Sequence, residues 1–544
     1  MMVFILGLLL AHLSICIAFG QHPIVSSSSG SIIGHRAPNR TDTFEFLGIK
    51  YGQAPVGELR FAAPLRYSAP TSQVFNASKF NPDCPSNKPP VTSFPDFTGN
   101  GFAIYSKFTA QNNNTQDEDC LALNIWTKSP RHLKRKNKPV FVFFHGGRFT
   151  IPGPNSPFYK GQNFAGMEDV VVVTVSYRLG ILGFSGAPGQ EQNAALRDQR
   201  LAVEWIRDNI SNFGGSPDHI IIFGQSAGGT SVDYWTYAYR HDPIIAGAIS
   251  HSGTAFSFLP NDPTYSTSLY HNVSSTLSCG TPPTTSPTTI LSCLRSAPLT
   301  RLLAAARLVP ALPSPALSQA PFHPTIDHTL IFPLSTYTNR SLTASFAPTP
   351  YLAGSTSNET GFYRVSASTA NVSLSNPAWH KFNHRAFTCP TKYAADARAR
   401  ARVPVWRYRY TPDWPNLRLY PATTNVSAAG AGKGGGGRPG SGAYHGSELS
   451  LLFGTTREVA GEENGAEQDR LGRYIMGAWA AFGRDPGRGL EGYGWPMWTG
   501  GQGEELVLLG EGNGDRAEFV GAGRFDGECP PVEENDPLPG RGAF

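Results

Sequence analysis

Four runs that are apolar except for Thr174 lie in the first half of the chain, at 140–144, 170–175, 220–223 and 244–249. An unbroken run predicts a strand that is covered on both faces, because a strand with one face in water alternates apolar and polar residues. Between the second and third runs, residues 193–213 place leucine, valine, isoleucine and tryptophan at helical spacing. This alternation of strands and helices predicts a doubly wound α/β fold, with a large, mostly parallel central sheet and helices on both faces.

Two stretches depart from this pattern. Residues 281–321 are rich in proline, serine and threonine, and only 300–308 show helical spacing. Residues 428–442 are rich in glycine and predict a flexible loop. The length of 544 residues would allow several domains, but the composition shows no clear break along the chain. We therefore interpret residues 21–544 as a single domain.

The N-terminal segment has the pattern of an export signal. Residues 3–19 are almost entirely apolar, and Ala18 and Gly20 supply small residues for cleavage before Gln21. The run is short for a membrane span and has no basic flank, which disfavours an uncleaved anchor. We expect residues 1–20 to be a signal peptide and the mature protein to be secreted, with no stable membrane anchor.

Charge and cysteine content narrow the function further. The net charge of +5 is small for this length, so it gives no reason to expect nucleic acid as a partner. Six cysteines follow the predicted signal peptide, and none has the Cys-x-x-Cys spacing of a zinc site, so no metal is expected. Their pairing is left open by the sequence alone. Nine Asn-x-Ser/Thr sequons suit a secreted glycoprotein.

The candidate nucleophile follows the third apolar run. That run leads into Gly-Gln-Ser-Ala-Gly at 224–228, and residues 227–239 suit a helix. A strand that ends in Gly-x-Ser-x-Gly before a helix holds the serine at a sharp, strained turn with its hydroxyl exposed. Small residues flank the serine because the backbone turns too tightly there for side chains. Ser226 is therefore the candidate nucleophile.

A serine nucleophile needs a base, and the base needs a carboxylate that orients it. In doubly wound hydrolases the acid and then the histidine follow the serine along the chain, on loops after strands. Glu359 lies just after a short predicted strand at 350–354, and His445 lies on a loop before an apolar run. Asp327 and Glu448 are rival acids. Glu359 could instead be a carboxylate favoured at a helix start.

A glycine pair follows the first apolar run, in the sequence His-Gly-Gly-Arg-Phe at 145–149. Small residues after a core strand allow backbone N–H groups to point into a shared cavity. Such donors stabilise the negative oxygen that forms when an ester carbonyl is attacked. The alternative is a tight glycine turn without this role, which its place at the end of a core strand makes less favourable.

These motifs resemble the type-B carboxylesterases, a family that includes cholinesterases, secreted fungal lipases and the adhesion proteins called neuroligins. The serine signature at 213–228 matches at every constrained position, and a second signature at 118–126 matches except at Ala122. The similarity spans nearly the whole mature chain and is weakest at 260–321 and after Ala422. It implies an α/β-hydrolase fold and a serine carboxylic ester hydrolase that acts on small-molecule esters, through an acyl-enzyme and without a cofactor.

The resemblance also implies roles for individual residues. The triad of nucleophile, acid and base is Ser226, Glu359 and His445. The oxyanion hole is formed by the backbone N–H groups of Gly147, Arg148 and Ala227. The implied disulfides join Cys84 to Cys120, Cys279 to Cys293 and Cys389 to Cys529.

Two departures from the family pattern bear on the substrate. Arg148 stands where many relatives have a third glycine, and we hypothesise that its side chain narrows or polarises the substrate entrance; a structural ion pair is the alternative. The stretch from Cys84 to Cys120 lacks the tryptophan with which cholinesterases hold a quaternary ammonium, so choline esters are not expected. The same stretch is polar, which disfavours the large lid of a true lipase. The alternative outside the enzymes is a catalytically silent adhesion or binding protein.

Overall fold

The computed structural model describes residues 22–87, 92–110, 114–128, 137–151, 153–309, 320–423, 438–500 and 504–534. The predicted signal peptide and most of the glycine-rich stretch at 428–442 lie outside these residues. Within the described ranges, no helix is both long and apolar enough to cross a bilayer.

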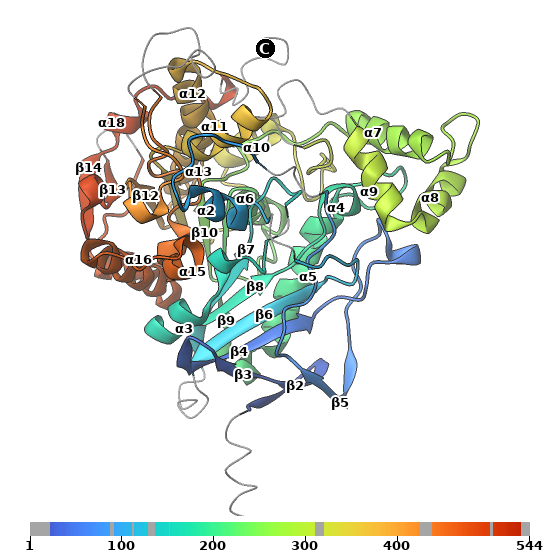
Figure 1. Cartoon of the computed structure of the whole chain (residues 1–544), viewed down its shortest axis with the longest axis horizontal. Coiled ribbons are helices and arrows are strands. Elements are labelled where there is room, and N and C mark those ends of the chain that lie inside the picture. Colours follow the sequence, from blue (N-terminus) through green and yellow to red (C-terminus); the bar gives the residue numbers. More distant parts are fainter. Residues whose placement is uncertain are drawn as a thin grey trace, which may run out of the picture.

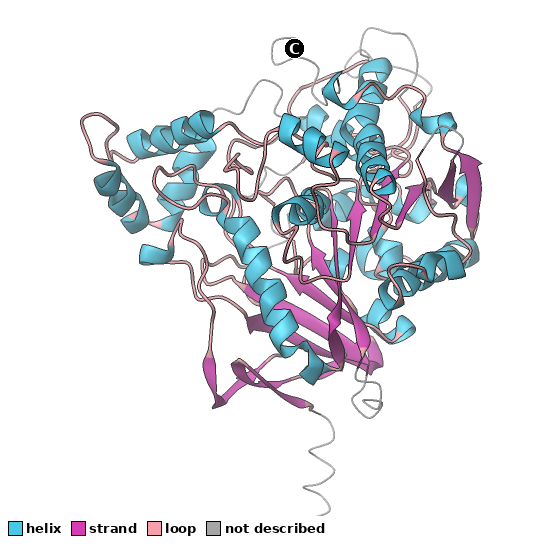
Figure 2. Cartoon of the chain, turned by 180° about the vertical axis from the view of Figure 1, so that it is seen from behind, coloured by secondary structure: helices cyan, strands magenta, loops and turns pink. Residues whose placement is uncertain are grey.

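A large mixed sheet runs through the molecule, and Figure 1 and Figure 2 show helices around it. In spatial order its described strands are β14 (Ala517–Gly521), β13 (Glu505–Leu509), β12 (Val405–Tyr410), β11 (Tyr351–Thr356), β10 (Gly247–His251), β9 (Gly215–Gln225), β7 (Lys138–Phe144), β8 (Val171–Val175), β6 (Ala122–Lys128), β4 (Arg40–Lys50) and β3 (His35–Ala37). Neighbouring strands from β13 to β8 pair in parallel. The pairs at the two ends are antiparallel. The predicted mostly parallel sheet is therefore confirmed. A smaller sheet contains β1 (Ile24–Ser27), β2 (Ser29–Ile33) and β5 (Ala69–Asn76).

Helices cover both faces of the sheet. The described helices are α2 (Gly101–Phe108), α3 (Gln162–Glu168), α4 (Gly180–Gly183), α5 (Ala194–Asn209), α6 (Ala227–Ala238), α7 (Pro263–Thr276), α8 (Pro287–Ser296), α9 (Leu299–Leu308), α10 (Leu334–Leu342), α11 (Thr360–Thr369), α12 (Asn376–Asn383), α13 (Cys389–Arg400), α14 (Leu449–Leu452), α15 (Thr456–Ala460), α16 (Ala466–Arg484), α17 (Gly489–Gly492) and α18 (Gly523–Asp526). Val140, Val142 and Phe144 of β7 belong to a buried cluster that includes α5 and α6. Phe141 and Phe143 belong to a second cluster that includes α3 and α16. Both faces of β7 are thus covered, which explains its unbroken apolar sequence.

Three of the four predicted strands lie within the observed strands, to within one residue, whereas the fourth is shifted by two to three residues toward the C-terminus. The run at 244–249 corresponds to β10, which begins at Gly247 and continues to His251. Ile244 has a φ of 49°, in the left-handed region, so the chain is not yet extended there. The displacement matters for function, because it places Ser252 directly after a core strand.

The region expected to be loose is more ordered than its composition predicts. Residues 281–321 contain α9, as predicted, and also α8, which is not predicted from the sequence. Pro287 occupies the first turn of α8, and the Ser286 hydroxyl accepts a hydrogen bond from the Thr289 N–H. Proline and serine therefore start this helix, although their abundance predicts a loop here. Helices α7, α8 and α9 share a third hydrophobic cluster and lie together at one side of Figure 1.

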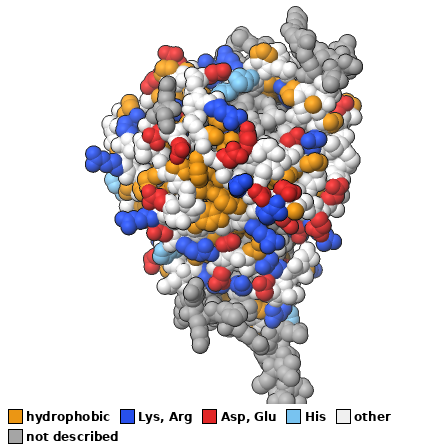
Figure 3. Space-filling model, turned by 90° about the vertical axis from the view of Figure 1, so that its left-hand side faces the viewer, with side chains coloured by type: hydrophobic (Ala, Val, Ile, Leu, Met, Phe, Trp, Pro, Cys, Tyr) orange, Lys and Arg blue, Asp and Glu red, His pale blue; other side chains and the backbone are white. Residues whose placement is uncertain are grey.

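The structure contains the three disulfides implied by the resemblance. They join Cys84 to Cys120, Cys279 to Cys293 and Cys389 to Cys529. On the face shown in Figure 3, basic and acidic side chains are interspersed around an apolar patch. This pattern agrees with the small net charge of the chain.

Candidate active site

Ser226 lies at a sharp turn between β9 and α6. Its φ of 58° and ψ of −122° fall in a region that a serine rarely adopts, at a cost on the order of 1–3 kcal/mol. The neighbouring glycines are required by close packing. A Cβ on Gly228 would lie 1.9 Å from the Phe144 carbonyl oxygen, and one on Gly224 would lie 2.4 Å from the Gly228 carbonyl carbon. The turn therefore has the strained geometry that the Gly-x-Ser-x-Gly sequence predicts.

Glu359 lies between the end of β11 and the start of α11 and is fully buried. Its Oε1 accepts hydrogen bonds from the Ser252 hydroxyl at 2.6 Å and from the Thr356 N–H at 2.7 Å. Its Oε2 lies 2.5 Å from Nδ1 of His445. The carboxylate makes no capping hydrogen bond to α11, so it does not act as a cap at the helix start. It faces His445 instead.

His445 lies on the loop before α14, as expected, and is almost fully buried. Its ring packs against those of Tyr363 and Phe387, with ring centroids 5.2 and 5.0 Å away. Because the carboxylate of Glu359 accepts a hydrogen bond from Nδ1, the proton of the neutral ring is placed on Nδ1. The other nitrogen, Nε2, has no hydrogen-bond partner in the described part of the chain. That nitrogen can therefore accept a proton.

Tyr363 contacts both the nucleophile and the histidine. Burial raises the pKa of the Tyr363 hydroxyl. The positive charge of Arg148 lowers this pKa in part, as do the hydrogen bonds of the hydroxyl with Ser226 and Arg148. The loop of His445 also reaches the serine turn, since a Cβ on Gly446 would lie 3.3 Å from Nε2 of Gln225. Because Nε2 of His445 is unpartnered, the described structure has no Ser226–His445 hydrogen bond. Catalytic hydrogen bonds are often open in unliganded structures and tighten with substrate.

The rival acids face other groups. Oδ1 of Asp327 accepts hydrogen bonds from the N–H groups of residues 329–331, so it shapes its own loop. Glu448 is buried, and its Oε1 lies 3.5 Å from Nδ1 of His251. Neither carboxylate contacts His445 in the described structure. Glu359 is therefore the acid that the fold brings to His445.

The loop after β7 packs against the serine turn. A Cβ on Gly146 would lie 3.0 Å from the Cβ of Ser226, and Gly147 has a φ of 94° that favours glycine. Ala227 is the first residue of α6, so its N–H has no acceptor within the helix. The residues expected to form the oxyanion hole, Gly147, Arg148 and Ala227, are thus near the nucleophile.

Two residues of the site, Ser252 and Tyr363, are not among those predicted from the sequence. Ser252 follows β10, the strand beside β9, and a signal was present, because the carboxyl ends of neighbouring parallel strands meet at one edge of the sheet. The predicted strand ends at residue 249, three residues before Ser252, so this signal does not identify the serine. Tyr363 lies in the first turns of α11, and nothing in its local sequence distinguishes it from a core aromatic residue.

Comparisons with known proteins identify the family of the chain. The profile of the carboxylesterase family matches residues 21–386. A chlorogenic acid esterase of Aspergillus niger is 31% identical over 531 residues, which cover 94% of each chain. Secreted lipase 5 of Gibberella zeae is 30% identical over 494 residues, or 87% of each chain. A thermophilic PNB esterase of known structure superposes with a TM-score of 0.72 at 25% identity, covering 93% of this chain and 98% of that one. The chain therefore belongs to the carboxylesterase family and is a carboxylic ester hydrolase.

Proposed function

We propose that this protein is a secreted serine carboxylesterase in which Ser226, His445 and Glu359 form the catalytic triad. The observation that carries the proposal is the buried contact between Glu359 and His445, beside the strained turn that holds Ser226. Three segments that are distant along the chain supply these groups. A packing role alone would not require a buried carboxylate, an imidazole with one open nitrogen and a serine in a rarely adopted conformation.

The reaction follows from this arrangement. Oγ of Ser226 attacks the ester carbonyl carbon while Nε2 of His445 takes its proton. The oxygen of the tetrahedral intermediate carries negative charge, which the N–H groups of Gly147, Arg148 and Ala227 would stabilise. The imidazolium then donates the proton to the departing alcohol, which leaves an acyl-enzyme. Water, deprotonated by His445, attacks this ester and releases the acid, and Glu359 balances the charge of the imidazolium in both halves.

We also propose the cellular context and the domain organisation. The relative named secreted lipase 5 and three disulfides support an extracellular protein, since disulfides persist in oxidising compartments. The central sheet takes its strands from residues 35 to 521, which supports a single domain over 21–544. Residues 1–20 would then be removed on export.

Covalent labelling with a fluorophosphonate probe tests the proposal directly. We expect the folded protein to be labelled at Ser226, identified in the modified peptide by mass spectrometry, and the heat-denatured protein to remain unlabelled. This dependence on folding is expected because the hydroxyl is activated only when His445 is beside it. Labelling at another serine, or none on folded protein, would favour the catalytically silent adhesion or binding protein.

A panel of p-nitrophenyl esters separates a soluble-ester hydrolase from a true lipase. Between Cys84 and Cys120 the described residues contain one helix, the eight-residue α2, in which Phe102 is 42% exposed. Since this helix is short, we expect faster turnover of soluble short-chain esters than of emulsified long-chain esters. A sharp rise in activity at the oil–water interface would instead indicate a lipase.

Replacing Arg148 with glycine is expected to change substrate preference. Its guanidinium carbon lies 5.1 Å from the centre of the Tyr363 ring, beside the nucleophile. A cation there favours esters that carry a negative group, because a hydrogen bond to a charged group contributes about 1.5–3 kcal/mol. We expect Arg148→Gly to lower kcat/KM for the mono-p-nitrophenyl ester of succinic acid about tenfold relative to p-nitrophenyl butyrate. Arg148→Lys should keep part of the preference, whereas equal losses for both esters would indicate a structural role.

The sequon at Asn358 is expected to remain unglycosylated. Nδ2 of Asn358 donates hydrogen bonds to the carbonyl oxygens of Gly440 and Ser441, at 3.0 and 2.9 Å. A glycan on this nitrogen would break both bonds beside the proposed catalytic acid. Mass spectrometry of glycopeptides from protein secreted by a glycosylating host checks this, with the other sequons as internal controls. A glycan at Asn358 on active enzyme would contradict the described loop.

A further inference from the structure

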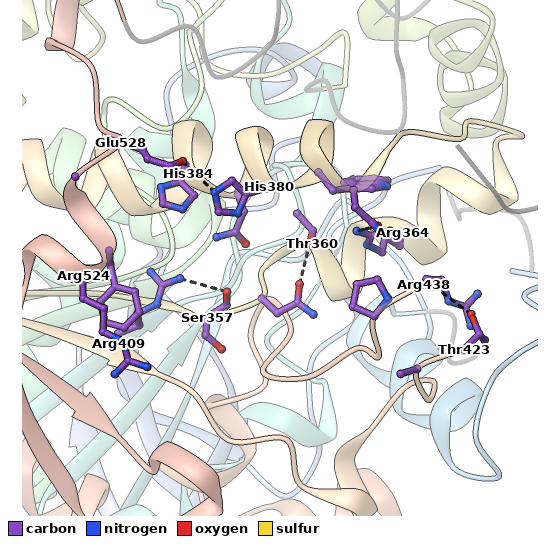
Figure 4. Close-up of a pocket in the computed structure, with 18 of the residues that line it drawn as sticks. Ser357, Thr360, Arg364, His380, His384, Arg409, Thr423, Arg438, Arg524 and Glu528 are labelled. Carbon is purple, nitrogen blue, oxygen red and sulfur yellow. Dashed lines mark hydrogen bonds and ion pairs between the residues drawn. The ribbon is translucent and has the colours of Figure 1, made fainter. Parts of the chain in front are cut away.

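A cavity of about 850 Å³ lies next to the loop that carries Glu359, and Figure 4 shows the side chains that line it. Ser357, Asn358 and Thr360 form part of its wall. The remaining wall comes from α11, α12, β12, α18 and residues around Arg438. Ser226 does not line this cavity, so the cavity is separate from the catalytic serine.

The lining of the cavity is strongly basic. Among the described residues, four arginines line it, and Glu528 is the one carboxylate. In Figure 4, Arg409 and Arg524 lie at one end, whereas Arg364 and Arg438 lie at the other. Positive charge is therefore present at both ends of the cavity, with Ser357 and Thr360 drawn between them.

Two of these arginines have no acidic partner among the described residues. Arg409 is almost fully buried, and within the described ranges its guanidinium donates only to the hydroxyl of Thr388 and the carbonyl oxygen of Ser357. Burial lowers the pKa of Arg409 to about 10, although Glu359 and Asp526 raise it in part. Those two carboxylates are already engaged, the first by His445 and the second by Arg407. A buried cation without a counter-ion is costly, so this end of the cavity favours an anion.

At the opposite end of the cavity, Arg364 likewise has no acidic partner among the described residues. Arg364 donates to the side-chain oxygen of Asn376 and lies 5.1 Å from the centre of the Trp379 ring. Burial lowers the pKa of Arg364 to about 10, and its Nε has no hydrogen-bond partner in the described ranges. Arg438 bonds Asp96 through one nitrogen, while its Nε and Nη2 are likewise unpartnered there. Buried guanidinium N–H groups without a hydrogen-bond partner among the described residues, on Arg409, Arg364 and Arg438, thus remain at both ends.

We propose that this cavity binds a small organic dianion, with one acidic group at Arg409 and the other at Arg364. Guanidinium groups bind carboxylates and phosphates through paired hydrogen bonds, so both chemistries fit the two ends. The neutral hydroxyl and amide groups between them suit the polar body of a sugar acid or a sugar phosphate. The proposal goes beyond the ester hydrolysis proposed above and does not depend on it.

A metal ion is the competing occupant. His380, His384 and Glu528 offer ligand atoms within 4.8 Å of one another at the Arg409 end. His380 is already within 3.0 Å of Glu528, and both side chains are exposed. The positive charges of Arg409 and Arg524 oppose a cation at this position. The geometry of the cavity therefore favours the anion.

Binding to the full-length, disulfide-intact protein tests the proposal. Calorimetric titration would use digalacturonate as the dicarboxylate and fructose 1,6-bisphosphate as the diphosphate, with maltose, acetate and zinc chloride as comparisons at equal ionic strength. We expect one or both dianions to bind at least tenfold more tightly than acetate, and maltose and zinc not to bind. Absence of dianion binding, or binding of zinc alone, would overturn the proposal. Which dianion binds more tightly identifies the carboxylate or phosphate chemistry.

Substitutions locate the site. Arg364→Gln and Arg409→Gln are each expected to weaken dianion binding at least tenfold, whereas Arg473→Gln, at an exposed position of α16, should leave it unchanged. Because Arg409 is buried, its variant is first checked for folding, and Arg364→Gln decides the matter if that variant does not fold. The Ser226→Ala protein should bind the dianion normally, which separates this proposal from the catalytic one. Unchanged dianion binding by the Arg364→Gln protein would overturn the proposal of a dianion site.

Discussion

Replacing Ser226 with alanine is expected to lower kcat for p-nitrophenyl esters by about 10⁴-fold or more, because the members of a triad act as a unit. The substitution removes only Oγ, the atom that attacks the carbonyl. Alanine can occupy the same backbone conformation at a similar cost, so the turn should persist. The loss therefore reports on chemistry, and it is measured from initial rates at saturating substrate.

Two controls separate this effect from damage to the fold. The melting temperature of the Ser226→Ala protein should stay close to that of the parent. Ser268→Ala, at an exposed position of α7, should retain full activity. Residual activity within tenfold of the parent protein would mean that another residue is the nucleophile.

The core strands could be predicted from the sequence because of where they lie. Strands β7, β8 and β9 have helices on both faces, so their central residues are almost entirely apolar. Strand β6 was not predicted as a strand, because it contains the polar residues Asn124 and Thr127. The side-chain amide of Asn124 donates a hydrogen bond of 3.0 Å to the hydroxyl of Thr174 on the neighbouring strand β8. A polar residue whose partner is 50 positions away gives no local signal of a buried strand.

Individual residues of the candidate site could be predicted from the sequence, but the contacts between them could not. The turn at Ser226 is a local feature, since a strand, a small-residue turn and a helix follow one another. The choice of acid is a long-range feature. Glu448 is three residues from His445 along the chain yet faces His251, whereas Glu359 is 86 residues away and contacts the imidazole. Spacing alone could therefore not decide between them.

The basic cavity has no counterpart in the sequence analysis. Its arginines come from α11, β12, α18 and the segment after 437, which are far apart in the chain. Only folding brings these charges together around one space, and only burial shows which of them lack an acidic partner. A search for local runs of basic residues finds none of the four.

Glu359→Gln is expected to lower kcat by about 10³–10⁴-fold, although glutamine has nearly the same shape as glutamate. In the parent protein, Oε1 accepts hydrogen bonds from Ser252 and Thr356. The amide oxygen of glutamine would keep these two donors, which places its NH₂ group against Nδ1 of His445. Nδ1 must then accept a hydrogen bond, so the ring proton moves to Nε2. A protonated Nε2 cannot take the proton of Ser226, and glutamine cannot balance the charge of an imidazolium.

The matched control is Glu448→Gln, which makes the same chemical change three residues from His445. Since Glu448 faces His251, this variant should lose much less activity than Glu359→Gln. Both variants are compared by kcat across the pH range, with melting temperature as the check on folding. A large loss in Glu448→Gln together with an active Glu359→Gln protein would assign the acid to Glu448. The opposite outcome is expected, because the tautomer of His445 is set by the carboxylate that touches Nδ1.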